Sequence, residues 1–427
     1  MSDDERDDEG YEREGLIGPP PLEVSAVPPR MLANRPFLWL VLAEGFAGLG
    51  LWTYFLAVMG DAAYRFDATP GQLGILLASF SITFIPSTPP FGTLADRWSP
   101  QRMMVVAVVA FGGSLVLASM ATTVTLLYLS MAWVGLAEGV LWPARGALIP
   151  RLVERDQLVR ANGMIGLVRE LPMALGPAMG GVAVGLWGRQ APYWVGLAAL
   201  AVAFVFYALV PDRRVDARIH DSFLRDLGAG LRVGLHVPVL RLLFATGVGA
   251  MLVLGVMQTL EPLFVRSVLA RGQDALGFLW SMQGVGALLS SILLIRLRRA
   301  VGAEMVVIAV GVVIGGAGLL LYAATGVYAI AILGAALFGF GYPLFFSTGQ
   351  ALIQRISDAP GKVSSVFIVL SEIGPLVAAL GIGVLGQVDV QLWLVGSAAG
   401  LLVLGAMVMW ASRRPALLVE EASARAS

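Results

Sequence analysis

The sequence predicts an all-α integral membrane protein whose twelve transmembrane helices form two pseudo-symmetric bundles of six helices each. Three observations lead to this prediction: the composition of the chain, the length of its uncharged segments, and an internal repeat. Of the 427 residues, 57% are hydrophobic and only 14% are charged. Soluble domains carry about 25% charged residues. The chain therefore has too little polar surface to cover a water-exposed exterior, and lipid must contact much of it.

The uncharged segments have the length of membrane-crossing helices, which is about 20 predominantly apolar residues. Three segments contain no Asp, Glu, Lys or Arg: 68–95, 275–295 and 390–412. Two longer uncharged runs, 103–137 and 305–354, each contain a small polar break and therefore predict two helices apiece. Together with the remaining apolar segments, these runs predict twelve spans: 36–60, 71–95, 102–121, 125–146, 161–187, 191–211, 240–265, 275–296, 304–323, 328–352, 363–386 and 389–411.

The distribution of basic residues predicts the orientation of the chain, because cytoplasmic loops of membrane proteins carry an excess of Lys and Arg. If the N-terminus is cytoplasmic, 24 of the 29 Lys and Arg residues fall in cytoplasmic segments. The outer loops then hold only four: Arg65, Arg189, Arg266 and Arg271. We therefore predict a multi-pass protein of the cytoplasmic (inner) membrane with both termini in the cytoplasm.

Hydrophilic segments divide the chain into five predicted parts. Residues 1–35 are rich in Asp, Glu and Pro and predict a disordered, acidic cytoplasmic tail. Six-helix bundles are expected at 36–211 and 239–411, and residues 412–427 form a second cytoplasmic tail. Between the bundles, residues 212–238 contain leucines at helical spacing opposed by charged residues. This pattern indicates either a helix on the cytoplasmic membrane face or a plain linker helix.

The two predicted bundles contain similar short segments at corresponding places, 202 to 204 residues apart. The pairs are Leu73–Leu76 with Leu276–Leu279, Ala147–Arg151 with Ala351–Arg355, and Glu170 with Glu372. Each pair falls in equivalent spans, so the sequence indicates a duplicated six-helix unit. Such repeats are typical of transporters that move one half against the other around a central site.

The segment between the second and third spans reads Gly92-Thr-Leu-Ala-Asp96-Arg97-Trp-Ser-Pro-Gln-Arg102. It resembles the signature loop of the major facilitator superfamily, Gly-x-Leu-Ala-Asp-Arg-x-Gly followed by basic residues. The resemblance implies the fold of that superfamily. It also implies that Asp96 and Arg97, with Gly92 and Arg102, form a gate between the bundles on the cytoplasmic side. Residues 99–101 depart from the family pattern, which leaves Arg102 as the only distal cation.

The fifth span contains Gly176-Pro177-Ala-Met-Gly180-Gly181. It resembles the Gly-Pro-x-x-Gly-Gly element that proton-coupled exporters of the superfamily carry in this helix. More broadly, residues 143–181 are similar to the bacterial enterobactin-exporter and macrolide-efflux branch. The resemblance favours export over uptake, whereas the small residues alone are also consistent with a generic helix-packing motif. Met131 stands where many drug exporters have an Arg, which leaves proton coupling through that position open.

Several ionisable residues fall within predicted spans, where an unpaired charge costs about 2.5–3.5 kcal/mol on insertion scales. By the resemblance, Glu44, Glu138 and Glu261 lie in helices that line the central cavity, and they are candidates for proton coupling or substrate contact together with Arg145. For Glu44 and Glu138 the alternative is a structural carboxylate. Glu261 is alternatively a solvated charge at the outer rim, and Arg145 alternatively reaches the membrane surface.

Two further sets of residues complete the candidate site. Glu170 and Glu372 are expected at the contact between the halves, either as a structural bridge or as a functional pair. Five aromatic residues are expected either to stack on a substrate in the cavity or to pack within the bundles: Trp52, Tyr54, Trp133, Trp142 and Tyr342.

These observations predict a secondary active transporter that exports small amphipathic molecules, drug-like or siderophore-like, by proton antiport with alternating access. Alternatives are a nutrient-uptake symporter or a lipid flippase of the same fold, or a non-transporting membrane receptor. The chain has no Cys, its two His lie in one loop, and no phosphate-binding loop is present, so we predict no metal, no cofactor and no enzyme activity. The expected partners are a small-molecule substrate, protons and membrane lipid, with no nucleic acid, and we expect a monomer.

Overall fold

The computed structural model describes residues 34–154, 157–212, 223–297, 304–357 and 360–413. Most of the two predicted tails and part of the predicted linker lie outside these residues. The first half contains α2 (Arg35–Gly60), continued by the π-helix η1 (Asp61–Arg65), then α3 (Pro70–Arg97), α4 (Pro100–Ser119), α5 (Val124–Leu152), α6 (Leu158–Trp187) and α7 (Ala191–Leu209). The shorter α8 (Phe223–His236) precedes the second half. That half contains α9 (Pro238–Ser267), α10 (Gln273–Leu297), α11 (Glu304–Ala323), α12 (Tyr328–Ile356), α13 (Pro360–Leu385) and α14 (Val390–Ser412).

Residues of high capping propensity mark where several helices begin. The Asn34 side chain accepts a hydrogen bond from the Phe37 amide at the start of α2. Thr69 and Gln72 form a reciprocal capping box at the start of α3. Asp389 caps α14 in the same way as Asn34 caps α2. Because the first turn of a helix leaves backbone N–H groups without internal partners, these side chains fix the helix starts locally.

Of the described helices, 11 are long and apolar enough to cross a membrane by length and composition. The remaining long helix, α6, carries Arg169 and Glu170 near its middle and packs between α2 and α10. Both α5 and α12 run past their predicted ends at 146 and 352, to Leu152 and Ile356. A hydropathy criterion detects only the lipid-contacting part of a helix, whereas the helix itself continues into the polar interface.

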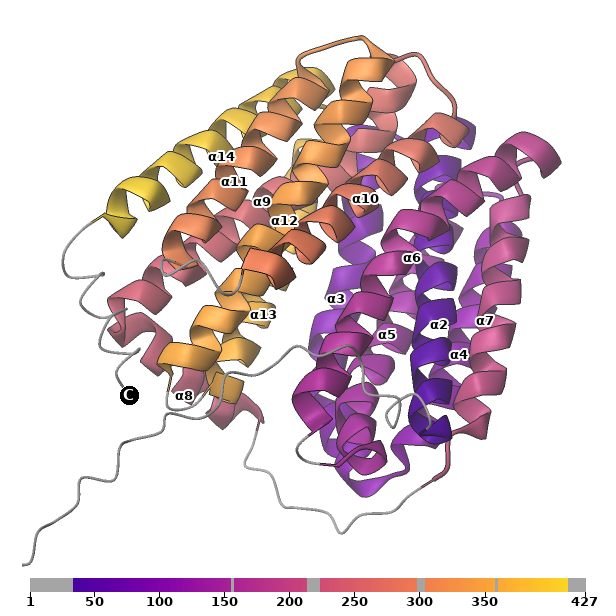
Figure 1. The fold of residues 1–427 in the computed structure, drawn as a ribbon. Coiled ribbons are helices and arrows are strands. Elements are labelled where there is room, and N and C mark those ends of the chain that lie inside the picture. Colours follow the sequence, from indigo (N-terminus) through magenta and orange to yellow (C-terminus); the bar gives the residue numbers. More distant parts are fainter. Residues whose placement is uncertain (1–33, 155–156, 213–222, 298–303, 358–359, 414–427) are drawn as a thin grey trace, which may run out of the picture.

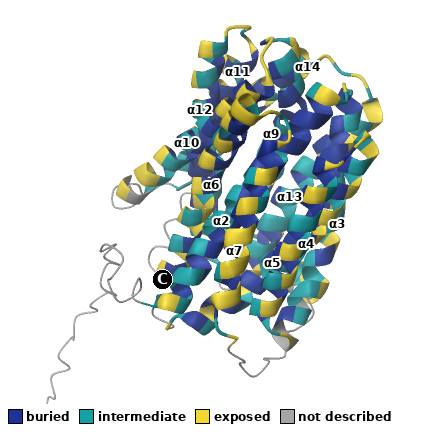
Figure 2. Cartoon of the chain, turned by 90° about the vertical axis from the view of Figure 1, so that its right-hand side faces the viewer, coloured by how far each residue is buried: buried dark blue, intermediate teal, exposed yellow. Residues whose placement is uncertain are grey.

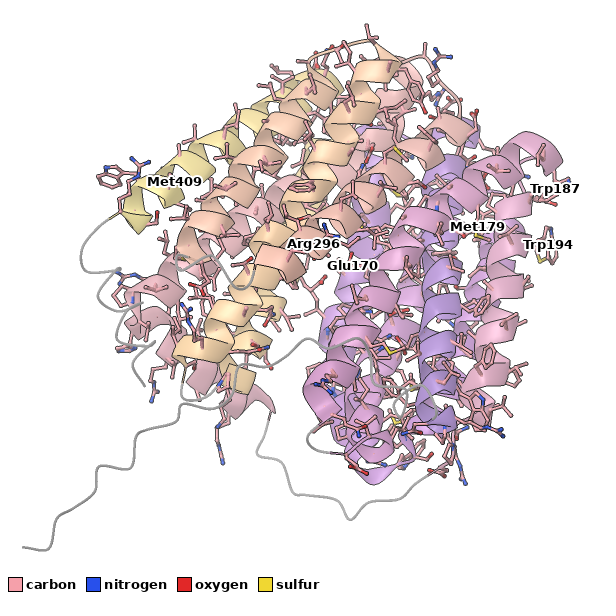
Figure 3. The ribbon with its side chains drawn as sticks, in the orientation of Figure 1. Glu170, Met179, Trp187, Trp194, Arg296 and Met409 are labelled. Carbon is pink, nitrogen blue, oxygen red and sulfur yellow. The ribbon has the colours of Figure 1, made fainter. Side chains whose placement is uncertain are left out.

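Many large hydrophobic side chains are exposed on the helices. Figure 2, turned by 90° from Figure 1, shows exposed positions in yellow along the helices that face the viewer. Exposed tryptophans gather near both ends of the bundles: Trp98 and Trp410 at one end, and Trp187, Trp194 and Trp393 at the other. Figure 3 shows Trp187 and Trp194 at the outer edge of the first half, pointing away from the protein. An apolar exterior between two levels of Trp is the arrangement expected for lipid contact.

The packing of the first half is repeated in the second. In the first half, α2 packs on α6 and α7, α3 and α4 pack on α5, and α4 packs on α7. The corresponding contacts in the second half are α9 on α13 and α14, α10 and α11 on α12, and α11 on α14. The backbone repeats too: Asp67 and Ala270, which are 203 residues apart in the chain, both have φ of 50°. The duplication predicted from short sequence matches is therefore visible in the fold.

The two halves contact each other through two equivalent helix pairs, α3 with α13 and α6 with α10. Glycines carry both contacts. A Cβ atom added at Gly277 of α10 would lie 3.1 Å from the Gly181 Cα of α6. A Cβ atom added at Gly74 of α3 would lie 3.2 Å from the Gly383 Cα of α13. The nearest backbone atoms would be closer still, the Pro177 carbonyl oxygen at 2.5 Å from the first added Cβ and the Ala379 carbonyl oxygen at 2.3 Å from the second. Real Cβ atoms essentially never come that close, so only glycine allows the backbones to approach in this way.

The halves are closed at one end and separated at the other (Figure 1). We call the end that holds α8 and the start of α2 the α8 end, and the opposite end, which holds η1, the far end. At the far end, the Gly71 amide donates to the Gly386 carbonyl at 3.0 Å and the Gln273 amide donates to the Leu56 carbonyl at 3.1 Å. Towards the α8 end, by contrast, Gly163 and Gly166 of α6 have no atom of another element within 4 Å of an added Cβ.

Helix α8 packs against the second half through α9 and α13. Gly230 approaches the backbone of Lys362, and Gly234 approaches the ring of Phe244. Leu231 and Leu235 remain 39% and 49% exposed, and Arg225 and Arg232 are exposed as well. The amphipathic pattern predicted for this segment therefore forms a helix, and part of its apolar face is left uncovered by protein.

The glycine contacts lead to a first prediction. Replacing Gly277 by Ala places a methyl group against the α6 backbone, and we expect a loss of about 1–3 kcal/mol of stability because the two helices must move apart. Gly381→Ala is the matched control, because an added Cβ there meets no atom within 4 Å. The check is the thermal unfolding midpoint of both variants in lipid nanodiscs. Equal midpoints for the two variants would contradict the assigned contact.

Candidate functional site

A buried ion pair lies in the first half, between α2 and α5. Glu44 of α2 is 2% exposed and pairs with Arg145 of α5, which is 9% exposed. The other carboxylate oxygen of Glu44 accepts a hydrogen bond from the Tyr207 hydroxyl of α7 at 2.9 Å. Three helices therefore converge on one carboxylate. Arg145 does not extend to the membrane surface, and the alternative interpretation that it does is wrong.

Glu138, Trp142 and Arg145 lie four and three residues apart on α5 and therefore share one face of that helix. The guanidinium carbons of Arg145 and of Arg169, from α6, lie 5.5 and 4.5 Å from the ring centroid of Trp142. Glu138 is 9% exposed and interacts electrostatically with both arginines and with Glu44. It forms no hydrogen bond or ion pair with any residue that the structure describes.

The second half contributes an aromatic residue, Tyr342, to this group of charged and aromatic side chains. Tyr342 of α12 stacks on Phe346 with ring centroids 5.5 Å apart. Its hydroxyl interacts electrostatically with Glu170 of α6 and Glu372 of α13, and with Arg169. Figure 3 shows Glu170 between the two halves. Neither Glu170 nor Glu372 forms an ion pair with a described residue, so a salt bridge between halves, which we considered for them, is not formed in this arrangement.

Glu261 of α9 lies in the second half near the far end, and it is only 1% exposed. The Gln283 amide of α10 donates to both carboxylate oxygens, at 2.9 and 3.1 Å. The Tyr322 hydroxyl of α11 donates to one of them at 2.9 Å. The interpretation of Glu261 as a solvated rim charge is therefore wrong, because its carboxyl group is enclosed by three helices.

Asp61 is a buried carboxylate that sequence reasoning missed. It begins η1, is 1% exposed, and accepts hydrogen bonds from Arg189 at 2.9 Å and from the Tyr193 hydroxyl at 3.1 Å. Arg65 of η1 lies 3.7 Å from it as well. We predicted that the first span ends at residue 60 and that Arg65 and Arg189 lie in loops. The internal repeat could have indicated Asp61, because Glu261 lies 200 residues further along the chain, close to the repeat offset of 202 to 204 residues.

The predicted gate residues are found in different places. Gly92 packs against its own half only, since an added Cβ would meet just Pro143 within 4 Å. The side chains of Asp96 and Arg97 lie outside the part of the chain that the structure describes. Arg102 pairs with Asp212, which follows α7, at 3.3 Å, and its side chain is 71% exposed. Both partners belong to the first half, and the halves are separated at this end, so the predicted contact across the gate is not formed in this arrangement and stays a prediction.

The Gly-Pro element of α6 joins α6 to two other helices. An added Cβ at Gly176 would lie 2.7 Å from the Trp52 Cβ of α2, and one at Gly180 would meet Leu56 of α2. Gly181 faces the other half, where an added Cβ would lie 2.9 Å from the Asp274 carbonyl oxygen of α10. The Pro177 carbonyl approaches Gly277. The motif therefore serves both packing inside the first half and the contact between halves.

The five predicted cavity aromatics are found in different places. Trp142 and Tyr342 lie beside the charged group described above. Tyr54 is fully buried and forms a 2.6 Å hydrogen bond with Ser130, so it packs inside the first half between α2 and α5. Trp133 lies beside Gly113 of α4 and is 44% exposed, on a different face of α5 from Glu138. Trp52 faces α6. A cavity position is therefore wrong for Tyr54 and Trp133.

The arrangement holds several ionisable groups at membrane depth. Among the described residues, no group of three or more His, Cys, Asp or Glu side chains is placed to hold a metal ion. The unpaired carboxyl groups Glu138, Glu170 and Glu372 face the cation of Arg169 and the paired Arg145. If all of them ionise, acidic groups outnumber cations around this space.

The ion pair yields a second prediction. Glu44→Gln removes the partner of a buried Arg145 and should lower stability by about 3–5 kcal/mol, because breaking a buried pair leaves an uncompensated charge. The double variant Glu44→Gln with Arg145→Met should recover much of this loss. A double-mutant cycle of unfolding midpoints is the check. Single-variant losses that simply add would show that the two side chains do not depend on each other.

Comparison with known proteins agrees with this fold. The model of the Major Facilitator Superfamily matches residues 40–379. An uncharacterized MFS-type transporter, YfiS of Bacillus subtilis, is 20% identical over 62% of this chain and 65% of its own length. A putative multidrug resistance protein, MdtD of Klebsiella pneumoniae, is 26% identical over 61% of this chain and 53% of its own. The matched part thus spans about half to two thirds of the length of these relatives.

A solved structure shares the fold over nearly the whole chain. The crystal structure of a bacterial homolog of the human lysosomal transporter Spinster, in an inward-facing and unoccupied conformation, superposes with a TM-score of 0.71 at 15% identity. The match covers 93% of this chain and 99% of that one. The family match, the twelve long helices of the described residues and the duplicated packing agree with one another: the chain belongs to the major facilitator superfamily.

Proposed function

We propose that this transporter exports small amphipathic molecules, drug-like or siderophore-like, in exchange for protons, by alternating access. Its substrate site is the space lined by Glu138, Trp142, Arg169 and Tyr342. Both termini and the α8 end face the cytoplasm, in agreement with the distribution of arginine. The transporter acts as a monomer in the cytoplasmic membrane, with lipid around it.

The proposal rests mainly on the surroundings of Glu138. It is a carboxyl group at membrane depth with no hydrogen-bonding or ionic partner among the described residues, and it lies next to two arginines and an aromatic ring. An isolated charge in such a place costs several kcal/mol. A proton or a cationic substrate group removes that cost in turn, which is the competition that antiport requires.

The charge balance of the site supports the same exchange. Glu170, Glu372 and Glu138 exceed the single arginine, Arg169, that has no carboxylate partner of its own in this group. Protons or the cationic part of an amphipathic substrate therefore enter this space more readily than an anion does. Trp142 and Tyr342 offer apolar faces for the rest of such a molecule.

The contacts between halves support alternating access. Far-end closure depends on two glycine contacts related by the duplication, so one rocking movement that separates both contacts opens the far end as it closes the α8 end. Export is favoured over uptake by the Gly-Pro element at this contact and by a relative named as a putative multidrug resistance protein. Uptake and lipid flipping stay as alternatives that a substrate assay separates.

The third prediction concerns Glu138. In proteoliposomes with an imposed pH gradient, Glu138→Gln should reduce proton-driven transport at least tenfold, because the neutral side chain no longer exchanges a proton. Glu154→Gln is the matched control, since Glu154 is an exposed carboxylate at the end of α5. A panel of lipophilic cations and siderophore-like compounds serves as substrate, and cell resistance at two external pH values identifies which compounds to load.

Undiminished proton-driven transport by Glu138→Gln would remove this residue from the coupling mechanism. Transport of none of the compounds by wild-type protein, together with accumulation of a nutrient or scrambling of a labelled lipid, would move the function to one of the alternatives.

A further inference from the structure

A second buried carboxyl group, Glu261, differs from the site above because every group that binds it is neutral. Gln283 and Tyr322 donate to it, and the Trp280 indole also faces it. No described Arg or Lys pairs with it. Its nearest counterpart in the first half, Asp61, is held by Arg189 and Arg65. The duplication has therefore left one far-end carboxylate neutralised by cations and the other not.

The two carboxylates occupy comparable places in the fold. Asp61 lies six residues before Asp67, and Glu261 lies nine residues before Ala270, the two residues with matching positive φ. When the halves are aligned on Asp67 and Ala270, the positions of Asp61 and Glu261 therefore differ by about one helical turn. Each also accepts a hydrogen bond from a buried tyrosine hydroxyl, Tyr193 for Asp61 and Tyr322 for Glu261. The chain itself thus offers a matched pair of sites that differ in cation content.

Glu261 also lies on the helix that fastens the far end. Arg266, five residues further along α9, pairs with Asp67 and donates to the Ala63 carbonyl, both in the first half. Tyr64 of η1 interacts electrostatically with Glu261 across the same contact. The Tyr64 hydroxyl is buried and has no hydrogen-bond partner among the described residues. Opening of the far end would carry α9 away from η1 and admit water next to Glu261.

The other described ionisable groups around Glu261 lie on neighbouring helices and on α9 itself. They are Tyr64 on η1, Asp274 on α10, Tyr322 on α11, Tyr328 on α12 and Arg266 on α9 itself. The ionisable residues of α13 are Lys362 and Glu372, and the described part of α14 carries no Asp, Glu, Lys or Arg before residue 413. Of the described cations in this region, Arg266 is engaged with Asp67, and the Arg271 guanidinium carbon lies 5.4 Å from the Tyr328 ring centroid.

We propose that Glu261 is a proton-binding site that controls closure of the far end. The carboxyl group is protonated when the halves are in contact there, and it is ionised when the far end is open to water. The reason is that contact removes water from a carboxyl group that has no cation to replace it. This inference rests on the proposed proton antiport and deepens it, because it makes far-end closure conditional on a bound proton.

The expected pH dependence follows from the sign of this linkage. Low pH protonates Glu261 and favours the closed far end, whereas high pH ionises it and favours the open one. The chain contains no Cys, so Thr122→Cys and Ala324→Cys place two spin labels uniquely, on exposed residues at the far end of the two halves. The fourth prediction is that the distance between these labels in lipid nanodiscs increases as pH rises.

Three variants test whether Glu261 causes the pH-dependent change in distance. Glu261→Gln mimics the protonated group and should keep the short distance at every pH, while Asp61→Asn should retain the wild-type response. Tyr322→Phe removes a donor to the ionised carboxylate, so ionisation of Glu261 should require a higher pH and the increase in distance should shift to higher pH. A Glu261→Gln protein that keeps the full pH response would overturn the proposal, as would an Asp61→Asn protein that loses it.

The measurement needs no substrate, so its failure is distinct from failure of the proposed export. A protein that switches with pH through Glu261 but transports none of the tested compounds supports this inference and contradicts the export proposal. A protein that exports in exchange for protons, but whose distance between labels responds to pH in the same way with and without Glu261, supports the export proposal and contradicts this inference.

Discussion

Backbone approach at the far end is the constraint on which the rest of the structure depends. At Gly74 and Gly277 the helices of opposite halves are so close that a side chain does not fit. In lipid there is no hydrophobic force between helices, so association relies on such close packing and on the hydrogen bonds it brings together. The Gly71–Gly386 bond and the contacts of Gln273 and Arg266 all form at this end.

The buried charges are distributed around that constraint. Where α2, α5 and α7 meet, the carboxylate of Glu44 has both a cation, Arg145, and a hydroxyl donor, Tyr207. Closer to the space between the halves, Glu138, Glu170 and Glu372 are not paired. At the far end, Asp61 has arginines and Glu261 has none. The protein thus contains carboxyl groups with three kinds of surroundings, and only those without a paired cation are suited to exchange protons during transport.

The fold could be predicted from the sequence because lipid leaves few alternatives. Every backbone polar group must be satisfied within a helix, so uncharged segments of the right length define the architecture, and the repeat defines the two halves. The glycine contacts could also be anticipated, since Gly74 and Gly277 belong to the repeated segments. The family resemblance rested on the same segments and on the loop after the second span.

The site was less predictable for two physical reasons. First, uniformly apolar helices carry little periodic signal, so the sequence did not show that Tyr54 and Trp133 face away from Glu138. Second, Asp61 ended a predicted span because a charge normally marks the membrane surface, whereas here Arg189 from another helix allows the charge to be buried. The Tyr207–Glu44 bond joins residues 163 apart in the chain, and nothing in the local sequence indicates it.

The tryptophans at both ends connect this architecture to the bilayer. Each half carries them at two levels: Trp98 with Trp187 and Trp194 in the first half, and Trp410 with Trp393 in the second. Since indole rings favour the headgroup region, each half is anchored in both leaflets at once. A half that tilts must therefore deform the headgroup layers or pull some rings out of them. The thickness of the surrounding membrane accordingly contributes to the balance between conformations, independently of any ligand.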